Sequence, residues 1–174
     1  MAHLSQMSFK VGIVPTPAPE TRVNVGTSPT PLALTGFTMQ VSVSTPAIIK
    51  KADPDAKICT ETVMALFDTG ASKTSIDIRL AEHLGLTPVG MSTSHTAAGP
   101  TMSPNYAVDI SFPGSRLSPF INLPIGSCKL PLKIGENGEI ELTQRNFGML
   151  IGRDIMTRWN IVWDGPTSMV FISD

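Results

Sequence analysis

Charge, aromatic side chains, cysteine and long apolar runs are all scarce in this chain. Charged residues make up 16% and aromatic residues 6% of its 174 positions, with 13 Lys and Arg against 14 Asp and Glu. Because phosphate binding needs concentrated positive charge, the absence of a basic cluster argues against nucleic acid as a partner. No apolar run reaches the roughly eighteen residues of a membrane-spanning helix, and the N-terminus lacks the pattern of a signal peptide. We therefore expect a cytoplasmic protein with no membrane contact.

The two cysteines, Cys59 and Cys128, lie far apart and form no Cys-x-x-Cys pair. No histidine stands near either of them at the spacing of a zinc ligand set. His95 likewise belongs to no local signature of a Cys-His nucleophile pair. We therefore expect two free thiols, no metal and no organic cofactor.

Proline divides the chain into two parts. Five of the 15 prolines fall before residue 32, so residues 1–34 predict an extended arm without helices. Three possibilities stay open for this arm: it is partly mobile, it wraps the core, or it wraps a partner subunit. Residues 35–174 predict one domain, because a chain with 41% hydrophobic residues buries a core without disulfides or metal.

Alternating apolar and polar residues predict an all-β domain, a small closed barrel or a sandwich. Residues 37–43 and 58–67 predict a hairpin around a polar turn at 50–55. A short helix is predicted from Ile76 to Leu84, with Asp77 as N-cap and Gly85 as the stop. A second brief helix is expected after residue 152. Further strands are expected at 106–112, 120–125, 129–134, 139–142, 147–151, 160–163 and 169–172.

The most informative motif is Asp68-Thr69-Gly70, which ends the apolar run from Val63 to Phe67. It places a carboxylate at a tight turn, where Gly70 permits close backbone approach and Thr69 supplies a hydroxyl. Peptide hydrolysis by carboxylates needs two Asp side chains that share one proton. The sequence holds one such tripeptide. One copy per chain implies a symmetric homodimer in which each subunit contributes Asp68.

A second motif lies about eighty residues downstream, where residues 147–156 predict an apolar strand, a glycine break and a short helix. With both motifs, the chain resembles the retropepsin-like aspartic proteases, the family of the retroviral proteases and their cellular relatives, over roughly Val63 to Asp174. The resemblance implies a homodimeric aspartic endopeptidase with a small closed β-barrel, a peptide or protein substrate and no cofactor. The N-terminal third is not visibly matched.

The resemblance also implies a role for each motif residue. Asp68 and its symmetry mate hold the water, the Thr69 hydroxyl locks the two loops together, and Gly70 gives access to the substrate backbone. Substrate contacts are expected from Ala71 and Ser72 beside the loop, and from Ala97, Ala98 and Gly99 at the tip of a flap. Structural support beneath the loop is expected from Leu150, Ile151, Gly152 and Arg153.

The small residues at 97–99 also suit a flap on chemical grounds, because they leave the backbone free to bond a substrate. An ordinary surface hairpin is the alternative, since small residues are common at turns.

The chain departs from the retroviral pattern directly after the loop. Retroviral members carry an acidic residue there that pairs with the arginine of the second motif, whereas Ser72 and Lys73 follow here. Arg153 therefore needs another partner, and Asp154, Asp77 or a backbone carbonyl are the candidates.

Three alternatives to an active protease stay open. In the first, the domain has lost catalysis and serves as a dimerisation or peptide-binding module. In the second, the tripeptide is a coincidence in an unrelated β-barrel binding protein, which the second motif disfavours. In the third, the chain is monomeric until it is concentrated or joined to a longer polyprotein.

Overall fold

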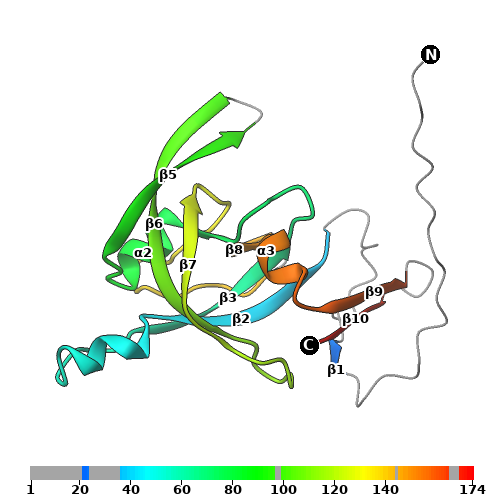
Figure 1. The fold of residues 1–174 in the computed structure, drawn as a ribbon, viewed down its shortest axis with the longest axis horizontal. Coiled ribbons are helices and arrows are strands. Elements are labelled where there is room, and N and C mark those ends of the chain that lie inside the picture. Colours follow the sequence, from blue (N-terminus) through cyan, green and yellow to red (C-terminus); the bar gives the residue numbers. More distant parts are fainter. Residues whose placement is uncertain (1–20, 24–35, 97–98, 144, 165–168) are drawn as a thin grey trace.

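The computed structural model describes residues 21–23, 36–96, 99–143, 145–164 and 169–174 (Figure 1). The helical elements are a 3-10 helix, η1 Ala47–Lys51, and two short α-helices, α2 Ile78–His83 and α3 Arg153–Met156. The strands are β1 Thr21–Val23, β2 Thr38–Ser44, β3 Thr60–Phe67, β4 Ser75–Asp77, β5 Pro88–Thr96, β6 Gly99–Ser111, β7 Phe120–Cys128, β8 Phe147–Ile151, β9 Asn160–Asp164 and β10 Met169–Ser173. Among the described residues, none of the helices has the length and apolar character needed to cross a bilayer.

Six strands close into a barrel. Their order is β2-β3-β8-β4-β7-β6, and β2 pairs back onto β6, which removes the open edges. β5 pairs with β6 outside this ring, so the two form a long hairpin that extends from the barrel (Figure 1). The predicted all-β barrel with short helices is therefore confirmed.

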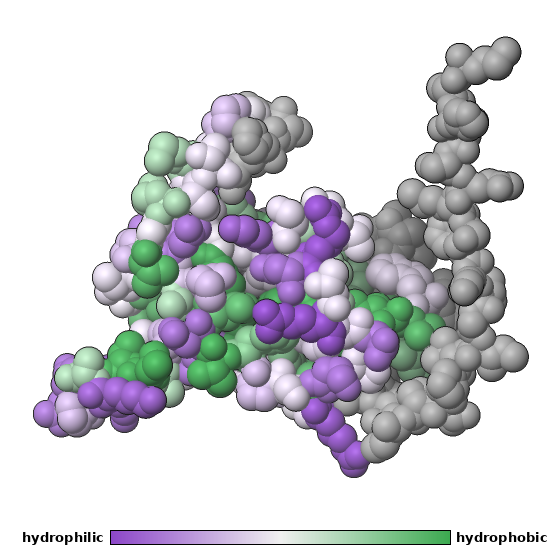
Figure 2. All heavy atoms as spheres, viewed as in Figure 1, coloured by the Kyte–Doolittle hydropathy of each residue, from purple (hydrophilic) through white to green (hydrophobic). Residues whose placement is uncertain are grey.

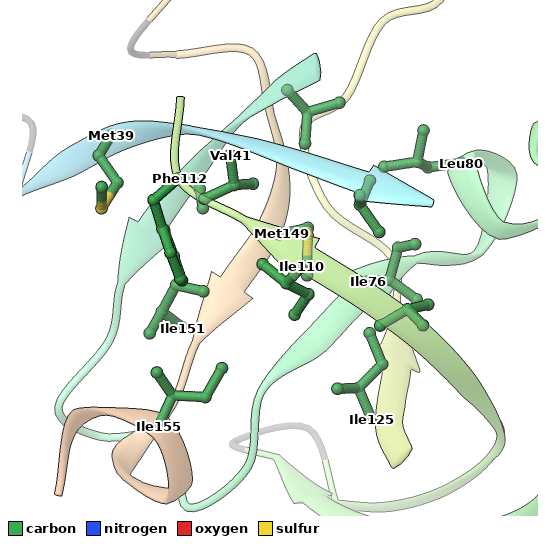
Figure 3. Close-up of a cluster of buried hydrophobic side chains, with 14 of the residues drawn as sticks. Met39, Val41, Ile76, Leu80, Ile110, Phe112, Ile125, Met149, Ile151 and Ile155 are labelled. Atoms are coloured by element: carbon green, nitrogen blue, oxygen red, sulfur yellow. The ribbon is translucent and has the colours of Figure 1, made fainter. Parts of the chain in front are cut away.

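The barrel interior is filled by alternate residues of its strands. In β2, Met39 and Val41 are buried while Gln40 between them is exposed, which is the period-2 pattern seen in the sequence. Figure 3 shows side chains from β2, β6 and β8 pointing toward one another, together with Ile155 of α3. Burial of this apolar surface is the main source of the fold's stability.

The predicted hairpin of β2 and β3 is present, with Val41 opposite Val63. Its connection differs from the plain turn that was expected, because Ala47–Lys51 forms the 3-10 helix η1. The backbone N–H of Ala47 at the start of this helix donates to Asp109 Oδ2 of β6 at 2.9 Å.

Two predicted strands, 129–134 and 139–142, are wrong. This segment contains only an isolated bridge between Ile134 and Ile140, joined by a turn at Gly135–Gly138. The side chain of Asn146 takes the place of a neighbouring strand: its Oδ1 accepts from Lys133 N, and its Nδ2 donates to Lys133 O and Glu141 O. Backbone groups bonded by a side chain are not available to a β-ladder.

The predicted helix begins two residues later than Ile76, which lies with Asp77 in β4. Asp77 is the N-cap as predicted, since its Oδ1 accepts from Arg79 N at 2.9 Å. Gly85 follows the helix with φ +65°, a conformation that glycine adopts at low cost.

Asp77 has further partners that no local pattern indicates. Its carboxylate is fully buried, pairs with Arg79 Nη2 at 2.8 Å and accepts from the backbone N–H of Leu130 at 2.7 Å. Burial alone would raise the pKa of Asp77, but the hydrogen bonds from Arg79 and Leu130 hold it below its ordinary value of 3.8. The ionised carboxylate therefore ties α2 to the segment after β7.

We expect Asp77→Ala to lower the free energy of unfolding by about 3 kcal/mol at neutral pH, because it removes an N-cap and a buried ion-pair partner. Since the folded pKa lies below the unfolded one, this stabilisation is complete above about pH 4 and is lost as the pH falls through the folded pKa. Urea unfolding at neutral and acidic pH measures the change. Asp77→Asn, which keeps a capping oxygen, should lower the free energy of unfolding by less. If Asp77→Ala lowers it equally at both pH values, the effect comes from packing and not from the charge of Asp77.

A separate three-stranded sheet has the order β1-β10-β9. β9 and β10 pair antiparallel within the same chain, and Val170 and Ile172 of β10 are buried. β1, the described part of the predicted arm, pairs with β10 of its own chain. This sheet lies at the opposite side of the barrel from the β5–β6 hairpin (Figure 1).

Candidate active site

Asp68 lies where β3 ends, and it is held from two sides. Its backbone N–H donates to Ile151 O of β8 at 3.1 Å, and its Oδ1 accepts from Gly70 N at 2.8 Å. A Cβ at Gly70 would lie 3.0 Å from that same oxygen, so a larger residue would crowd the carboxylate. Asp68 is half-buried, whereas Thr69 and Gly70 are exposed. The carboxylate is therefore oriented by its own loop and still accessible.

Gly152 lies against the far side of this loop. A Cβ there would lie 2.4 Å from the carbonyl carbon of Lys73 and 2.7 Å from Thr74 N. Its φ of −90° is available to any residue, so the requirement for glycine is steric. The β8–α3 junction thus contacts the loop backbone more closely than any side chain permits.

Arg153 supports the loop through backbone carbonyls. Its Nη1 donates to Thr69 O at 2.7 Å and Gly70 O at 3.1 Å, and its own N–H donates to Ala71 O at 3.0 Å. Of the three partners considered from the sequence, the backbone carbonyl is the one observed. A guanidinium at these carbonyls fixes the peptide planes that follow Asp68.

A second brace, between Thr74 and Asp154, is not indicated by any pattern in the sequence. The Asp154 carboxylate accepts from Thr74 N at 2.9 Å and from Thr74 Oγ1 at 2.8 Å. Thr74 Oγ1 in turn accepts from Gly152 N at 3.1 Å. Thr74 is fully buried, so its polar groups have no access to solvent and these bonds supply their partners. Asp154 was considered in the sequence as a partner for Arg153, but nothing there pointed to Thr74.

Aromatic rings pack against the residue that precedes Asp68. Phe67 lies 4.2 Å from Phe37 and 6.0 Å from Trp159, measured between ring centroids. Trp159 also contacts Phe112 and Phe120 edge to face. Such pairs add stability beyond the area they bury, and here they anchor the end of β3.

The family model for aspartyl protease matches residues 55–127, a stretch that contains the Asp68 loop, α2 and the β5–β6 hairpin. Over this stretch the chain is similar to the aspartyl proteases. Among solved structures, it is similar to a retropepsin-like aspartic protease from Rickettsia conorii, with 12% identity, 78% of this chain and 91% of that chain covered, and a TM-score of 0.38. No curated protein matches the sequence.

The two sequence motifs lie next to each other in the structure. Leu150 of β8 pairs with Leu66 of β3 and with Ser75 of β4, on either side of the loop. Residues 68–72 and 150–153 thus form one site, although about eighty positions separate them. The braces at Thr74 and Asp154 extend this site beyond the predicted residues.

The predicted flap corresponds to the β5–β6 hairpin. Ala97 and Ala98 lie outside the described residues, while Gly99 begins β6 opposite Thr96, with φ +111°. On one face of this hairpin, Ser92 Oγ donates to Asn105 Oδ1 at 2.7 Å. Whether the hairpin covers a substrate stays a prediction.

A nucleophilic role is disfavoured for the Cys128 thiol. Both cysteines are free and half-buried. Burial, followed by the nearby charge of Asp77, raises the pKa of Cys128 to about 11, although a hydrogen bond with Ser75 opposes the shift. A thiol that is protonated at neutral pH is a poor nucleophile. Within the described ranges, no cluster of three or more His, Cys, Asp or Glu side chains is arranged to hold a metal ion.

Proposed function

We propose that this protein is an aspartic endopeptidase that acts as a homodimer, with one Asp68 from each subunit. The observation that carries the proposal is the bracing of the Asp68 loop. β8 and α3 bond its backbone from below, while the carboxylate and the following two residues stay accessible. A catalytic group must be held in one fixed orientation before the substrate binds, and these bonds hold Asp68 in that way. An ordinary surface turn does not require such bonds.

In the proposed reaction, one Asp68 is ionised and its mate is protonated. The ionised carboxylate takes a proton from water as the water oxygen attacks the carbonyl carbon of the peptide bond. The protonated carboxyl donates a hydrogen bond to the carbonyl oxygen. As the C–N bond breaks, a proton passes to the leaving nitrogen, and the dyad returns to its shared-proton state.

The residues beside Asp68 are proposed to align the two loops and the substrate. The exposed Thr69 hydroxyl faces the partner's loop, while Ala71 and Ser72 border the extended peptide. The β5–β6 hairpin, with Ala97, Ala98 and Gly99 at its tip, closes over the peptide and excludes water. Lys73, in place of an acidic residue, changes the charge offered to the substrate beside the loop.

We expect hydrolysis of an unfolded protein to follow a bell-shaped pH profile on the acidic side of neutrality. Two carboxylates that share a proton titrate in two macroscopic steps, so the base is lost below the lower step and the acid above the upper one. A statine-type inhibitor should abolish the activity. The measurement is the initial rate between about pH 3 and about pH 9.

Two outcomes would contradict the proposal. A rate that climbs steadily toward alkaline pH would indicate a histidine or thiol mechanism. Inhibitor binding without cleavage at any pH would favour the alternative of an inactive peptide-binding module.

A further inference from the structure

A row of paired residues crosses the sheet beside the Asp68 loop. From β3 to β7 its members, joined pair by pair, are Leu66, Leu150, Ser75 and Gly126. Paired residues of neighbouring strands point to the same face of a sheet, so these positions form one continuous line. Asp68 follows Leu66 by two positions, and its N–H still bonds to β8, so strand alternation places the two side chains toward the same face. The row therefore begins beside the candidate catalytic carboxylate.

The row changes from apolar to polar as it leaves the loop. Leu66 and Leu150 are half-buried, and so is Ser75, the next member. At Gly126 a Cβ would lie 3.2 Å from Ser75 Oγ and 4.0 Å from Asn105 Oδ1, so these two polar side chains lie on either side of the glycine. We call Ser75, Gly126 and Asn105 the polar end of the row.

Asn105 offers a hydrogen-bond donor at this end. It lies half-buried on β6, and its Oδ1 accepts from Ser92 Oγ at 2.7 Å, so the group that it offers to a ligand is Nδ2. The residues beside it are Gly126 of β7 and Gly90 of β5, where a Cβ would lie 3.9 Å from Nδ2. Because neither glycine has a side chain, neither covers the amide.

Ser75 offers an acceptor at the same end. A hydrogen bond joins its side chain to Cys128, and a hydroxyl oxygen in one such bond still accepts another. The charges closest to it in the sequence are Asp77, which pairs with Arg79, and Lys73, which is exposed in the loop.

The hairpin adds no charge to this end. Residues 84–108, which include all of β5 and most of β6, contain no Asp, Glu, Lys or Arg. Figure 2 shows mostly pale surface over the upper part of the hairpin, in contrast to the deep purple of charged residues elsewhere on this face. The polar end therefore presents one neutral donor and one neutral acceptor.

We propose that the polar end is a subsite for a glutamine side chain of the peptide substrate. The inference rests on the proposed function, because Asp68 must cleave the peptide that this subsite holds. The carboxamide oxygen of glutamine accepts from Asn105 Nδ2, its N–H donates to Ser75 Oγ, and its apolar stem lies along Leu150. A leucine side chain leaves both protein groups unpaired, and a glutamate carboxylate has no proton to donate to Ser75.

The strand spacing sets where in the peptide this glutamine lies. Neighbouring strands are about 4.8 Å apart, so Ser75, two strands from β3, lies roughly 10 Å from it. An extended peptide advances about 3.3 Å per residue, so the glutamine lies within about three positions of the bond that is cleaved. Since the proposed homodimer has two such subsites, the preference should appear on both sides of that bond.

Peptides that differ at one position test the subsite. In a cleaved peptide, each of the three residues on either side of the scissile bond is replaced in turn by glutamine, leucine or glutamate, and kcat/KM is measured. We expect glutamine to exceed leucine and glutamate at least ~10-fold at one position on each side, as the loss of two hydrogen bonds implies. Asn105→Leu should bring that ratio to near unity, and Ser75→Ala should lower it. Continued cleavage of the leucine peptide shows that each variant is folded.

Gln40→Leu is the matched control, because it makes the same kind of amide-to-leucine change at an exposed position of β2. Its preference should equal that of the wild type. The subsite is wrong if leucine peptides are cleaved as fast as glutamine peptides, or if Asn105→Leu keeps the ratio. A preference for glutamate would also overturn it and would show that Lys73 sets the specificity.

Binding separates this inference from the proposed function. Fluorescence anisotropy measures the affinity of labelled glutamine and leucine peptides for Asp68→Asn, in which cleavage is expected to be lost. If the glutamine peptide binds at least ~10-fold more tightly, if this preference depends on Asn105, and if the wild type cleaves no peptide, then the subsite stands and the proposed function fails. Cleavage without a glutamine preference gives the reverse result.

Discussion

Asp68→Asn is expected to reduce peptide hydrolysis by at least about 10³-fold while leaving the fold and the dimer intact. Asn keeps the shape of the side chain and an oxygen that accepts from Gly70 N, so the loop geometry is preserved. What it removes is the proton acceptor of one subunit and the proton donor of the other. Initial rates and sedimentation of the purified variant measure the two expectations.

Two further proteins complete this test. Asp55→Asn makes the same chemical change at an exposed position of the η1 connection and should cleave at the wild-type rate. A mixed dimer with one Asp68→Asn subunit should be nearly inactive, because the two carboxylates act as one unit. Wild-type hydrolysis by the Asn variant would rule out Asp68 as the catalytic group.

Gly152→Ala is expected to destabilise the protein by about 3 kcal/mol, at the upper end of overpacking effects, because the atoms that the new methyl group meets are backbone. Its Cβ would lie 2.4 Å from Lys73 C and 2.6 Å from Lys73 O, so the chain that leads to Thr74 must move. Peptide hydrolysis should fall with the loss of the Thr74 bonds. Denaturant unfolding and initial rates measure both effects.

Gly90→Ala is the control for this substitution. At Gly90 a Cβ would meet only Asn105 Nδ2, at 3.9 Å, so stability should change little. If Gly152→Ala unfolds at the same denaturant concentration as the wild type, then the loop accommodates a side chain, and the β8–α3 junction does not fix its position.

The elements that the sequence predicts correctly are those whose cause is local. β2 is set by its alternation, and α2 by the Asp77 cap and the Gly85 stop. The segment 129–142 was predicted wrongly because Asn146, several residues away, takes the backbone groups that a strand would use. These bonds are tertiary contacts, and the alternation of apolar and polar residues in the sequence does not predict them.

The residues of the candidate site also fall into those that the sequence predicts and those that it does not. Asp68 and the residues of the second motif are predictable because each belongs to a short motif of characteristic residue types in a characteristic order. The Thr74–Asp154 brace joins residues eighty positions apart. Arg153 binds backbone carbonyls because Asp77 and Asp154, its other candidate partners, bind other groups. Pairings of this kind become visible only when the strands are in register.

The strand order β3-β8-β4 has a consequence for how the site is assembled. The Asp68 loop joins two strands that do not touch each other, because β8, supplied from much later in the chain, lies between them. Contacts between distant segments close large loops and form slowly. During synthesis, β3, the loop and β4 leave the ribosome without their central strand. The carboxylate is therefore not held in place until β8 and Arg153 have been made and the barrel has closed.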